Sequence, residues 1–183
     1  MSCFVFTMMR GAAPPSILRA MKFARTLRLD PSDTEVFDAP APPGEWAVTG
    51  TFAFVGDNPE GWTAKERLAF KSGWLGLGSF GRSTFVEVVV IPDDRFEAAV
   101  RDLAAHLFTA YDAPDMMAAL QAAREECADM AALCDHPAGT LLAIERNIAD
   151  GDAADGGITE RVRVIPVSGD GQHARIWGPA EDS

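Results

Sequence analysis

Three closely spaced glycines, Gly76, Gly78 and Gly81, form the most recognisable motif of the sequence, G-x-G-x-x-G. This spacing is typical of loops whose backbone amides hold the phosphates of a nucleotide. A protein kinase also needs a lysine on the following strand and the H-R-D and D-F-G motifs, but the last lysine is Lys71 and neither motif occurs. A dinucleotide-binding loop follows a strand and opens a helix. The order predicted here is the reverse, with a helix before the loop and a strand after it.

We therefore interpret the glycine segment as a closely packed connection from a helix to a strand, anchored by Trp74 and Phe80. A loop that binds a small ligand stays open as an alternative. Its candidate ligand-binding residues are Trp74, Ser79, Phe80 and Arg82.

Glu87 is the charged residue within the most apolar stretch of the sequence, residues 85–91. At a period of two residues it shares a strand face with apolar side chains. On a buried face, desolvation would raise its pKa and suit it to general acid–base catalysis, so Glu87 is the candidate catalytic residue. The alternative, which we favour, is a partly solvated face or a cross-strand ion pair with an arginine such as Arg82 or Arg163.

Cys127, Cys134 and His136 raise the question of a metal site. The cysteines are seven residues apart and so share a helix face, but zinc ligands usually lie closer together, as in C-x-x-C pairs. Both also fit the apolar seam of their helix, and we favour packing in the core. The aspartate-rich residues 150–157 lack the spacing and closing glutamate of a calcium loop. We predict neither a metal site nor a cofactor.

Composition argues against several classes of function. The chain has 183 residues, with 16 Lys and Arg against 27 Asp and Glu, and a net charge of −11. Nucleic acid requires a basic footprint, which this balance does not supply. A membrane partner is not expected, because no apolar run reaches the length of about 18 residues that a spanning helix needs. Three cysteines do not make a secreted disulfide framework, so a cytoplasmic location is predicted.

Hydrophobic periodicity and turn residues give the expected order of elements. Strands are predicted at residues 23–29, 46–56, 84–91, 140–148 and 158–165, with a short one at 34–37; one short helix is predicted at 63–73, and two long helices begin near residues 94 and 114. Thr63 and Glu66 fit a capping box. Gly50 predicts a bulge or a close backbone approach. The fold class is α+β, with a mostly antiparallel sheet of about five strands and the helices mainly on one face.

The chain is expected to have three parts. Residues 1–20 carry an apolar patch with no basic residue before it, unlike a signal peptide, and Met21 opens a clean strand. We expect residues 1–20 to be a disordered extension or an incorrectly assigned start. Residues 21–167 are predicted to form a single α+β domain, and residues 168–183 a loosely held tail.

The segments KFARTLRLD, GEWAVTGTFAF and GWLGLGSFGRSTFVEVV lie between Met21 and Ile91. Together they resemble a family of small uncharacterised bacterial proteins, a domain of unknown function. The resemblance extends to about Ile165. It brings no assigned activity, and it implies a setting similar to that of accessory proteins for molybdenum enzymes such as formate dehydrogenase.

The sequence favours a non-catalytic accessory or protein-interaction domain. No catalytic constellation is complete, and Trp62 and Trp74 look exposed beside the glycine segment. A protein partner is therefore expected, and a homo-oligomer is left open. The alternative is a small-molecule-binding protein or enzyme that uses a pocket between the glycine segment and the strand predicted at 46–56, with Glu87 as its catalytic group.

Overall fold

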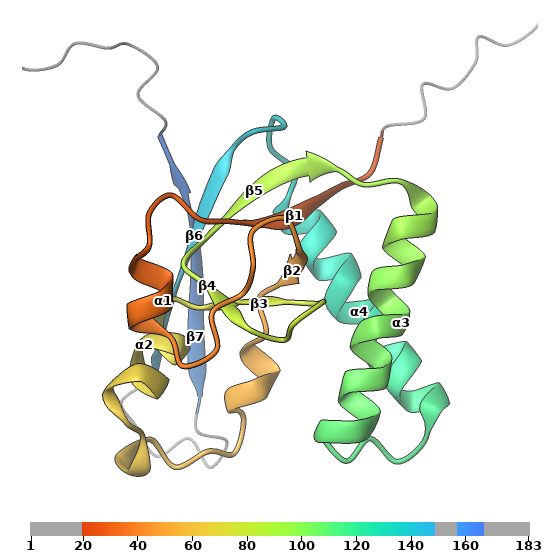
Figure 1. Cartoon of the computed structure of the whole chain (residues 1–183). Helices are drawn as coiled ribbons and strands as arrows, with labels where there is room; N and C mark the ends of the chain where they lie inside the picture. The colour runs from red at the N-terminus through yellow and green to blue at the C-terminus, as the bar shows by residue number, and fades with distance from the viewer. Residues whose placement is uncertain (1–19, 149–156, 167–183) are drawn as a thin grey trace, which may run out of the picture.

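The computed structural model describes residues 20–148 and 157–166. Within these residues a seven-stranded antiparallel sheet has the order β4-β3-β2-β1-β5-β6-β7, and four α-helices lie around it (Figure 1). The predicted α+β class and antiparallel sheet are confirmed. The sheet has seven strands rather than about five, because the glycine segment contributes two short strands that its turn residues conceal.

The bounds of the elements are as follows. The strands are β1 (Lys22–Leu27), β2 (Trp46–Val48), β3 (Trp74–Gly76), β4 (Arg82–Ser83), β5 (Phe85–Val90), β6 (Leu141–Ile148) and β7 (Ile158–Ile165). The α-helices are α1 (Ser32–Val36), α2 (Ala64–Ser72), α3 (Asp93–Ala110) and α4 (Met116–Leu133). Two short 3₁₀ helices are η1 (Thr51–Phe54) and η2 (Pro59–Gly61).

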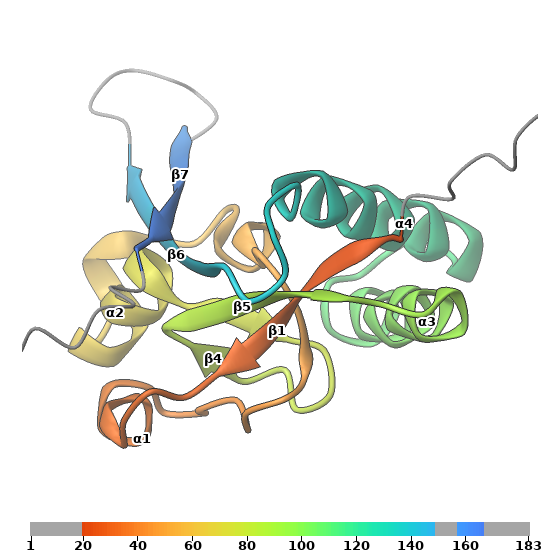
Figure 2. The ribbon, with the colours of Figure 1, turned by 90° about the horizontal axis from the view of Figure 1, so that it is seen from above.

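The helices lie in two groups at opposite sides of the molecule. Figures 1 and 2 show the two long helices α3 and α4 together on the right, and α1 and α2 on the left. The α3–α4 hairpin buries apolar residues three and four positions apart, which form one core with the sheet. On α3 these are Phe96, Val100, Leu103 and Leu107, and on α4 Ala119, Ala123, Cys127 and Met130. None of the helices in the described part of the chain is long and apolar enough to cross a membrane.

Helix α2 begins as its sequence predicts. The Thr63 hydroxyl accepts a hydrogen bond from the Glu66 amide at 3.2 Å, and the Glu66 carboxylate accepts one from the Thr63 amide at 2.7 Å. This reciprocal capping box satisfies two amides that the first turn would otherwise leave unpaired.

The short strand predicted at residues 34–37 is wrong, because this segment belongs to helix α1. The Asp30 carboxylate accepts a hydrogen bond from the Ser32 amide at 2.8 Å and starts a turn that continues as a helix. The Asp33 side chain is buried and accepts a hydrogen bond from the Thr84 hydroxyl at 2.5 Å. This tertiary contact holds the turn in a conformation that the local pattern does not predict.

The long strand predicted at residues 46–56 is also wrong beyond its first residues, since β2 ends at Val48 and the chain turns into η1. Gly50 lies between them with φ +67°, a left-handed conformation that favours glycine. A Cβ atom at this position would lie 2.5 Å from the Cβ of Leu75. The close backbone approach predicted for Gly50 is therefore confirmed.

The glycine segment forms the hairpin between β3 and β4 and lies between α2 and β5. The Gly76 amide donates to the Gly81 carbonyl at 2.9 Å across the turn. A Cβ atom at Gly81 would lie 2.8 Å from both the Ala39 carbonyl oxygen and the Ala41 nitrogen. The segment is thus a closely packed connection, as predicted, with glycine needed where two backbones meet.

Replacing Gly81 tests this packing. Because the crowding atoms belong to the backbone and cannot rotate away, we expect Gly81→Ala to lower the free energy of unfolding by about 1–3 kcal/mol. Gly61→Ala is the control, since no atom lies within 4 Å of its Cβ position. Urea unfolding of both variants measures the effect, and equal stabilities would contradict the packing argument.

Candidate functional site

Arg146 occupies a position on β6 where the sequence pattern calls for an apolar residue. It shares a strand face with the buried Leu142 and Ile144, and its side chain is 0% exposed. A buried guanidinium is stable only when its N–H groups find acceptors. The acceptors of Arg146 therefore reveal which segments depend on it.

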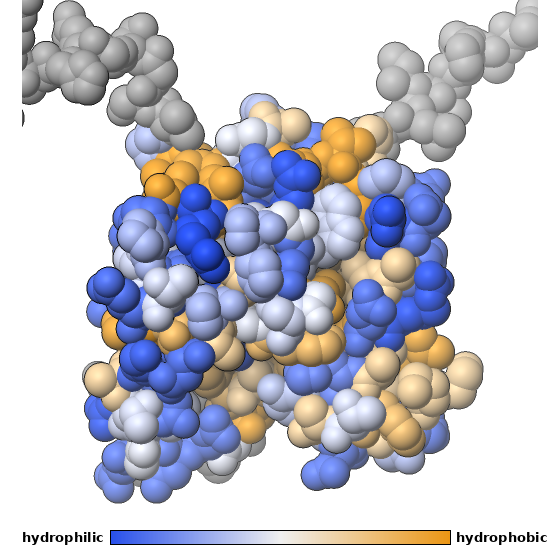
Figure 3. All heavy atoms as spheres, in the orientation of Figure 1, coloured by the Kyte–Doolittle hydropathy of each residue, from blue (hydrophilic) through white to orange (hydrophobic). Residues whose placement is uncertain are grey.

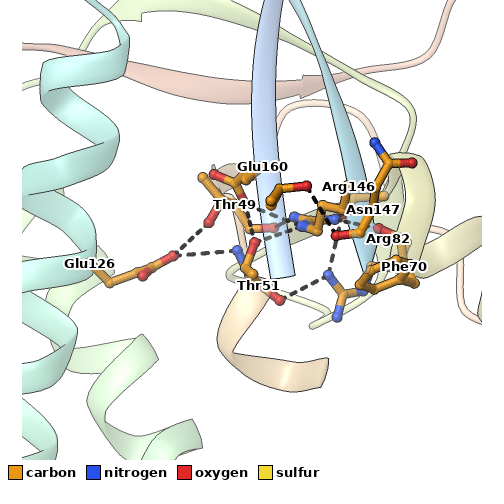
Figure 4. A network of polar contacts seen from close by, with 11 residues as sticks. Thr49, Thr51, Phe70, Arg82, Glu126, Arg146, Asn147 and Glu160 are labelled. Carbon is orange, nitrogen blue, oxygen red and sulfur yellow. Dashed lines mark hydrogen bonds and ion pairs between the residues drawn. The ribbon is translucent and has the colours of Figure 1, made fainter. Parts of the chain in front are cut away.

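The Arg146 guanidinium donates to three backbone carbonyls and two side chains (Figure 4). The acceptors are the carbonyls of Phe70 (2.8 Å), Gly73 (3.1 Å) and Thr49, the Thr51 hydroxyl (2.6 Å) and the Glu160 carboxylate (3.2 Å). They belong to the end of α2, the segment after β2, η1 and β7. One side chain thus joins four parts of the fold to β6.

Arg82 on β4 is the second cation of this buried arginine network. Its Nη1 donates to the carbonyls of Gly73 at 3.3 Å and Gly50 at 3.5 Å, and its guanidinium carbon lies 4.6 Å from the centre of the Phe54 ring. Burial, and then the charge of Arg146, lower the pKa of Arg82 to about 10. Arg82 stays charged at neutral pH, and its Nη1 is already used by two carbonyls of the protein.

Glu126 brings α4 into the network. Its carboxylate accepts hydrogen bonds from the Thr49 hydroxyl at 3.0 Å and the Gly50 amide at 3.4 Å. The Thr49 carbonyl accepts a hydrogen bond from Arg146, and the Gly50 amide donates one to Glu126. These backbone groups thus bond to side chains and not to a neighbouring strand. This is the physical reason why β2 ends at Val48.

Burial raises the pKa of Glu126, and the hydrogen bonds from Thr49 and Gly50 partly oppose that shift. A carboxyl group with a raised pKa suits general acid–base chemistry. However, Glu126 lines none of four hollows found on the described part of the surface. Its contacts indicate a structural link between α4 and the segment after β2.

The glycine segment encloses a carboxylate of the protein itself. Glu45 Oε2 accepts hydrogen bonds from the Ser79 amide at 3.0 Å and the Ser79 hydroxyl at 2.9 Å. A Cβ atom at Gly76 would collide with Glu45 Oε2, and one at Gly78 would lie 2.9 Å from Oε1. An internal carboxylate therefore lies against this loop, and its negative charge disfavours a phosphate there.

The candidate ligand-binding residues do not converge on one site. Trp74 is 0% exposed and belongs to the core, so the expectation that it is exposed is wrong. Phe80 stacks on His106 with ring centres 3.6 Å apart. Trp62 is half-buried and packs against Phe70. Ser79 and Arg82 make the internal contacts with Glu45 and the arginine network.

Glu87 forms an ion pair across the sheet. It lies directly opposite Arg25 on β1, and the Arg25 Nη2 to Glu87 Oε1 distance is 2.6 Å. A cross-strand pair with an arginine is thus confirmed, although the partner is neither Arg82 nor Arg163. Arg163 pairs with Glu145. Glu87 also points to the sheet face opposite that of Arg146, since its neighbour Val86 pairs with Leu142 on the Arg146 face.

Cys127 and Cys134 are free thiols buried in the core, in agreement with their predicted packing role. Burial raises the pKa of each thiol to about 12, so both are protonated at neutral pH. In the described residues no group of three or more His, Cys, Asp or Glu side chains could hold a metal ion. Most of the aspartate-rich segment, and the predicted extension and tail apart from Ala20, lie outside the described residues.

A hollow of about 380 Å³ lies beside the glycine segment, but none of the residues 46–56 that would form the predicted pocket line it. It lies between Leu77, Phe80 and the α3 residues Asp102 and His106. Burial, and then the charge of Arg82, lower the pKa of His106. Glu87, Ser79 and Arg82 are absent from its lining, so the proposed catalytic set is not assembled there.

The comparisons with known proteins place the chain in a family. A model described as "Family of unknown function (DUF6505)" matches residues 21–178, and the chain belongs to this family. This confirms the resemblance to an uncharacterised family. No curated protein and no solved structure matches.

Removing the Arg146 side chain tests the network. Arg146→Met leaves several buried carbonyls without a donor, so we expect a loss of about 3–5 kcal/mol in the free energy of unfolding. Arg163→Met is the control, because its half-exposed ion pair with Glu145 contributes about 0–1 kcal/mol. Arg146→Lys, which keeps a charge and three donors, should lose less than Arg146→Met. Urea unfolding measures these free energies. Similar losses of stability in Arg146→Met and Arg163→Met would contradict the stabilising role of the Arg146 hydrogen bonds.

The raised pKa of Glu126 predicts a pH dependence. The pKa of the Glu126 carboxyl is higher in the folded protein than its ordinary value of 4.5. Its contribution to the stability of the folded state is therefore complete at pH values below 4.5 and is lost as the pH rises through the folded-state pKa. Glu126→Gln keeps both acceptor contacts without the charge. We expect it to be more stable than the wild type at about pH 8, with a difference that narrows toward about pH 5. The exposed neighbour Glu125 provides the control Glu125→Gln, and a pH-independent difference for Glu126→Gln would contradict the assignment.

Proposed function

We propose that the protein is a non-catalytic interaction domain that binds a protein partner through the end of the α3–α4 hairpin. The carrying observation is a group of four large apolar side chains at this end, each at least 40% exposed. They are Phe108, Tyr111, Met116 and Met117, which we call the hairpin tip. Aromatic residues and methionine are enriched in protein–protein interfaces.

The surroundings of the hairpin tip indicate the chemistry of its partner. Residues 102–123 contain no lysine or arginine but three aspartates, Asp102, Asp112 and Asp115. Figure 3 shows apolar side chains gathered at the lower right, over the ends of α3 and α4. The surface is therefore apolar with an acidic rim. It complements a partner that presents apolar side chains surrounded by lysine and arginine.

The base of the tip is held by aromatic contacts. Tyr111 packs edge-on against Phe52 of η1, with ring centres 5.2 Å apart, and against His106 at 5.4 Å. His106 in turn stacks on Phe80 of the glycine segment. A surface fixed before binding loses less conformational entropy when a partner docks.

Several features favour interaction over catalysis. The buried Arg146 and the half-buried Arg82 donate hydrogen bonds to backbone carbonyls, and the half-buried Glu126 accepts one from a backbone amide. Glu87 is ion-paired with Arg25. A second copy of the chain is a poorer partner, because a symmetric contact through the tip would bring two acidic rims together. A molybdenum enzyme is one partner that this proposal allows. That suggestion rests on the family resemblance alone.

Capture from native lysate with a matched pair of variants tests the proposal. Met117 is 76% exposed. The control residue Leu29 is 57% exposed and lies between β1 and α1, and Figure 1 shows α1 on the opposite side of the molecule from α3 and α4. We expect Met117→Glu to reduce recovery of a stoichiometric partner at least about tenfold, whereas Leu29→Glu leaves it unchanged. Recovery that is equal in both variants, or a partner that proves to be a second copy of this chain, would overturn the proposal.

A further inference from the structure

A hollow of about 260 Å³ lies at the end of β6, and its lining differs in charge from the hairpin tip. Its walls come from η2, α2 and the last residues of β6. Its lining includes Trp62, Arg67, Phe70 and Lys71.

Among the described residues, the charged side chains that line this hollow are all cations, namely Arg67, Lys71 and Arg146. Three other hollows on the described surface each include at least one carboxylate. In a chain with a net charge of −11, a hollow whose charged lining is positive throughout the described residues favours an anion over a cation. Arg146 adds little to this charge, because its donors already bond to the protein and the Glu160 carboxylate pairs with its guanidinium. The positive charge of the hollow therefore rests on Arg67 and Lys71.

Arg67 and Lys71 are placed to supply the contacts. They are four residues apart on α2 and so lie on the same helix face, one turn apart. Arg67 Nε donates to the Trp62 carbonyl at 3.2 Å, which orients the guanidinium beside the aromatic wall. Within the described residues Lys71 has no acidic partner, in contrast to Lys65 on the same helix, which pairs with Asp38 at 3.3 Å.

The wall of the hollow is aromatic and held in place. Trp62 lies 4.9 Å from Phe70 between ring centres, and Phe54 packs edge-on against both rings. A fixed indole at the rim of an open hollow is suited to stacking with a planar ring.

We infer that this hollow binds a small ligand in which a planar ring carries an anionic group. The ring stacks on the Trp62 wall, and the anion is held by Arg67 and Lys71. Carboxylate and phosphate share this chemistry, and the volume limits the ligand to roughly the size of a substituted single ring or a small nucleotide.

The test is a titration of the whole protein with four probes: phenyl phosphate, benzoate, inorganic phosphate and phenol. We expect saturable binding of phenyl phosphate or benzoate by calorimetry. The anion alone and the ring alone should bind at least about tenfold more weakly, because each lacks half of the contacts. The order of phenyl phosphate and benzoate distinguishes a phosphate site from a carboxylate site.

Variants locate the binding. Lys71→Gln should weaken the better ringed probe about tenfold, and Lys65→Gln, its matched control on the same helix, should leave the affinity unchanged. Trp62→Leu should weaken the ringed probes and not inorganic phosphate. The inference is wrong if neither ringed anion saturates the protein, if inorganic phosphate binds as tightly as phenyl phosphate, or if both lysine variants lose affinity equally.

Discussion

The structure depends on the pairing of one guanidinium that has no access to water. Removing Arg146 from solvent costs several kcal/mol unless acceptors replace the lost water. The fold supplies carbonyls from the end of α2 and from Thr49, the Thr51 hydroxyl and the Glu160 carboxylate. To reach this arginine, the chain must leave the sheet after β2 and form η1. The shape of the centre of the molecule is therefore a consequence of satisfying Arg146.

The same network positions both surfaces to which we assign binding. Glu126 ties α4 to Gly50, and the following η1 places Phe52 against Tyr111 at the hairpin tip. On the other side, the Phe70 carbonyl that Arg146 holds belongs to the helix that carries Lys71 and the aromatic wall. The two surfaces differ in charge, one rimmed by aspartates and the other lined by cations. They are therefore suited to different kinds of partner.

Periodicity predicted the elements whose burial follows a local pattern. These are the strands β1, β5, β6 and β7 and the helices α3 and α4, while the capping box of Thr63 and Glu66 predicts α2. The close packing of the glycine segment is also predicted, but its β3–β4 hairpin is not. Prediction failed at α1 and η1, where Asp33 and Thr49 bond to groups distant in sequence. Arg146 left a signal, since it follows Leu142 and Ile144 at period two, but the acceptors that explain it come from four other segments. For Glu87 the sequence predicts an ion pair with an arginine across the sheet, but it does not identify Arg25 as the partner.

The central claim is that the protein acts by presenting the hairpin tip to a partner. Hydrogen exchange of the protein alone and in complex with its captured partner tests this most directly. The account predicts slower exchange of the amides at residues 105–118 in the complex, with unchanged rates along β7 and around Trp62. Protection that is confined to β7 or to the cationic hollow, with residues 105–118 unaffected, would contradict it.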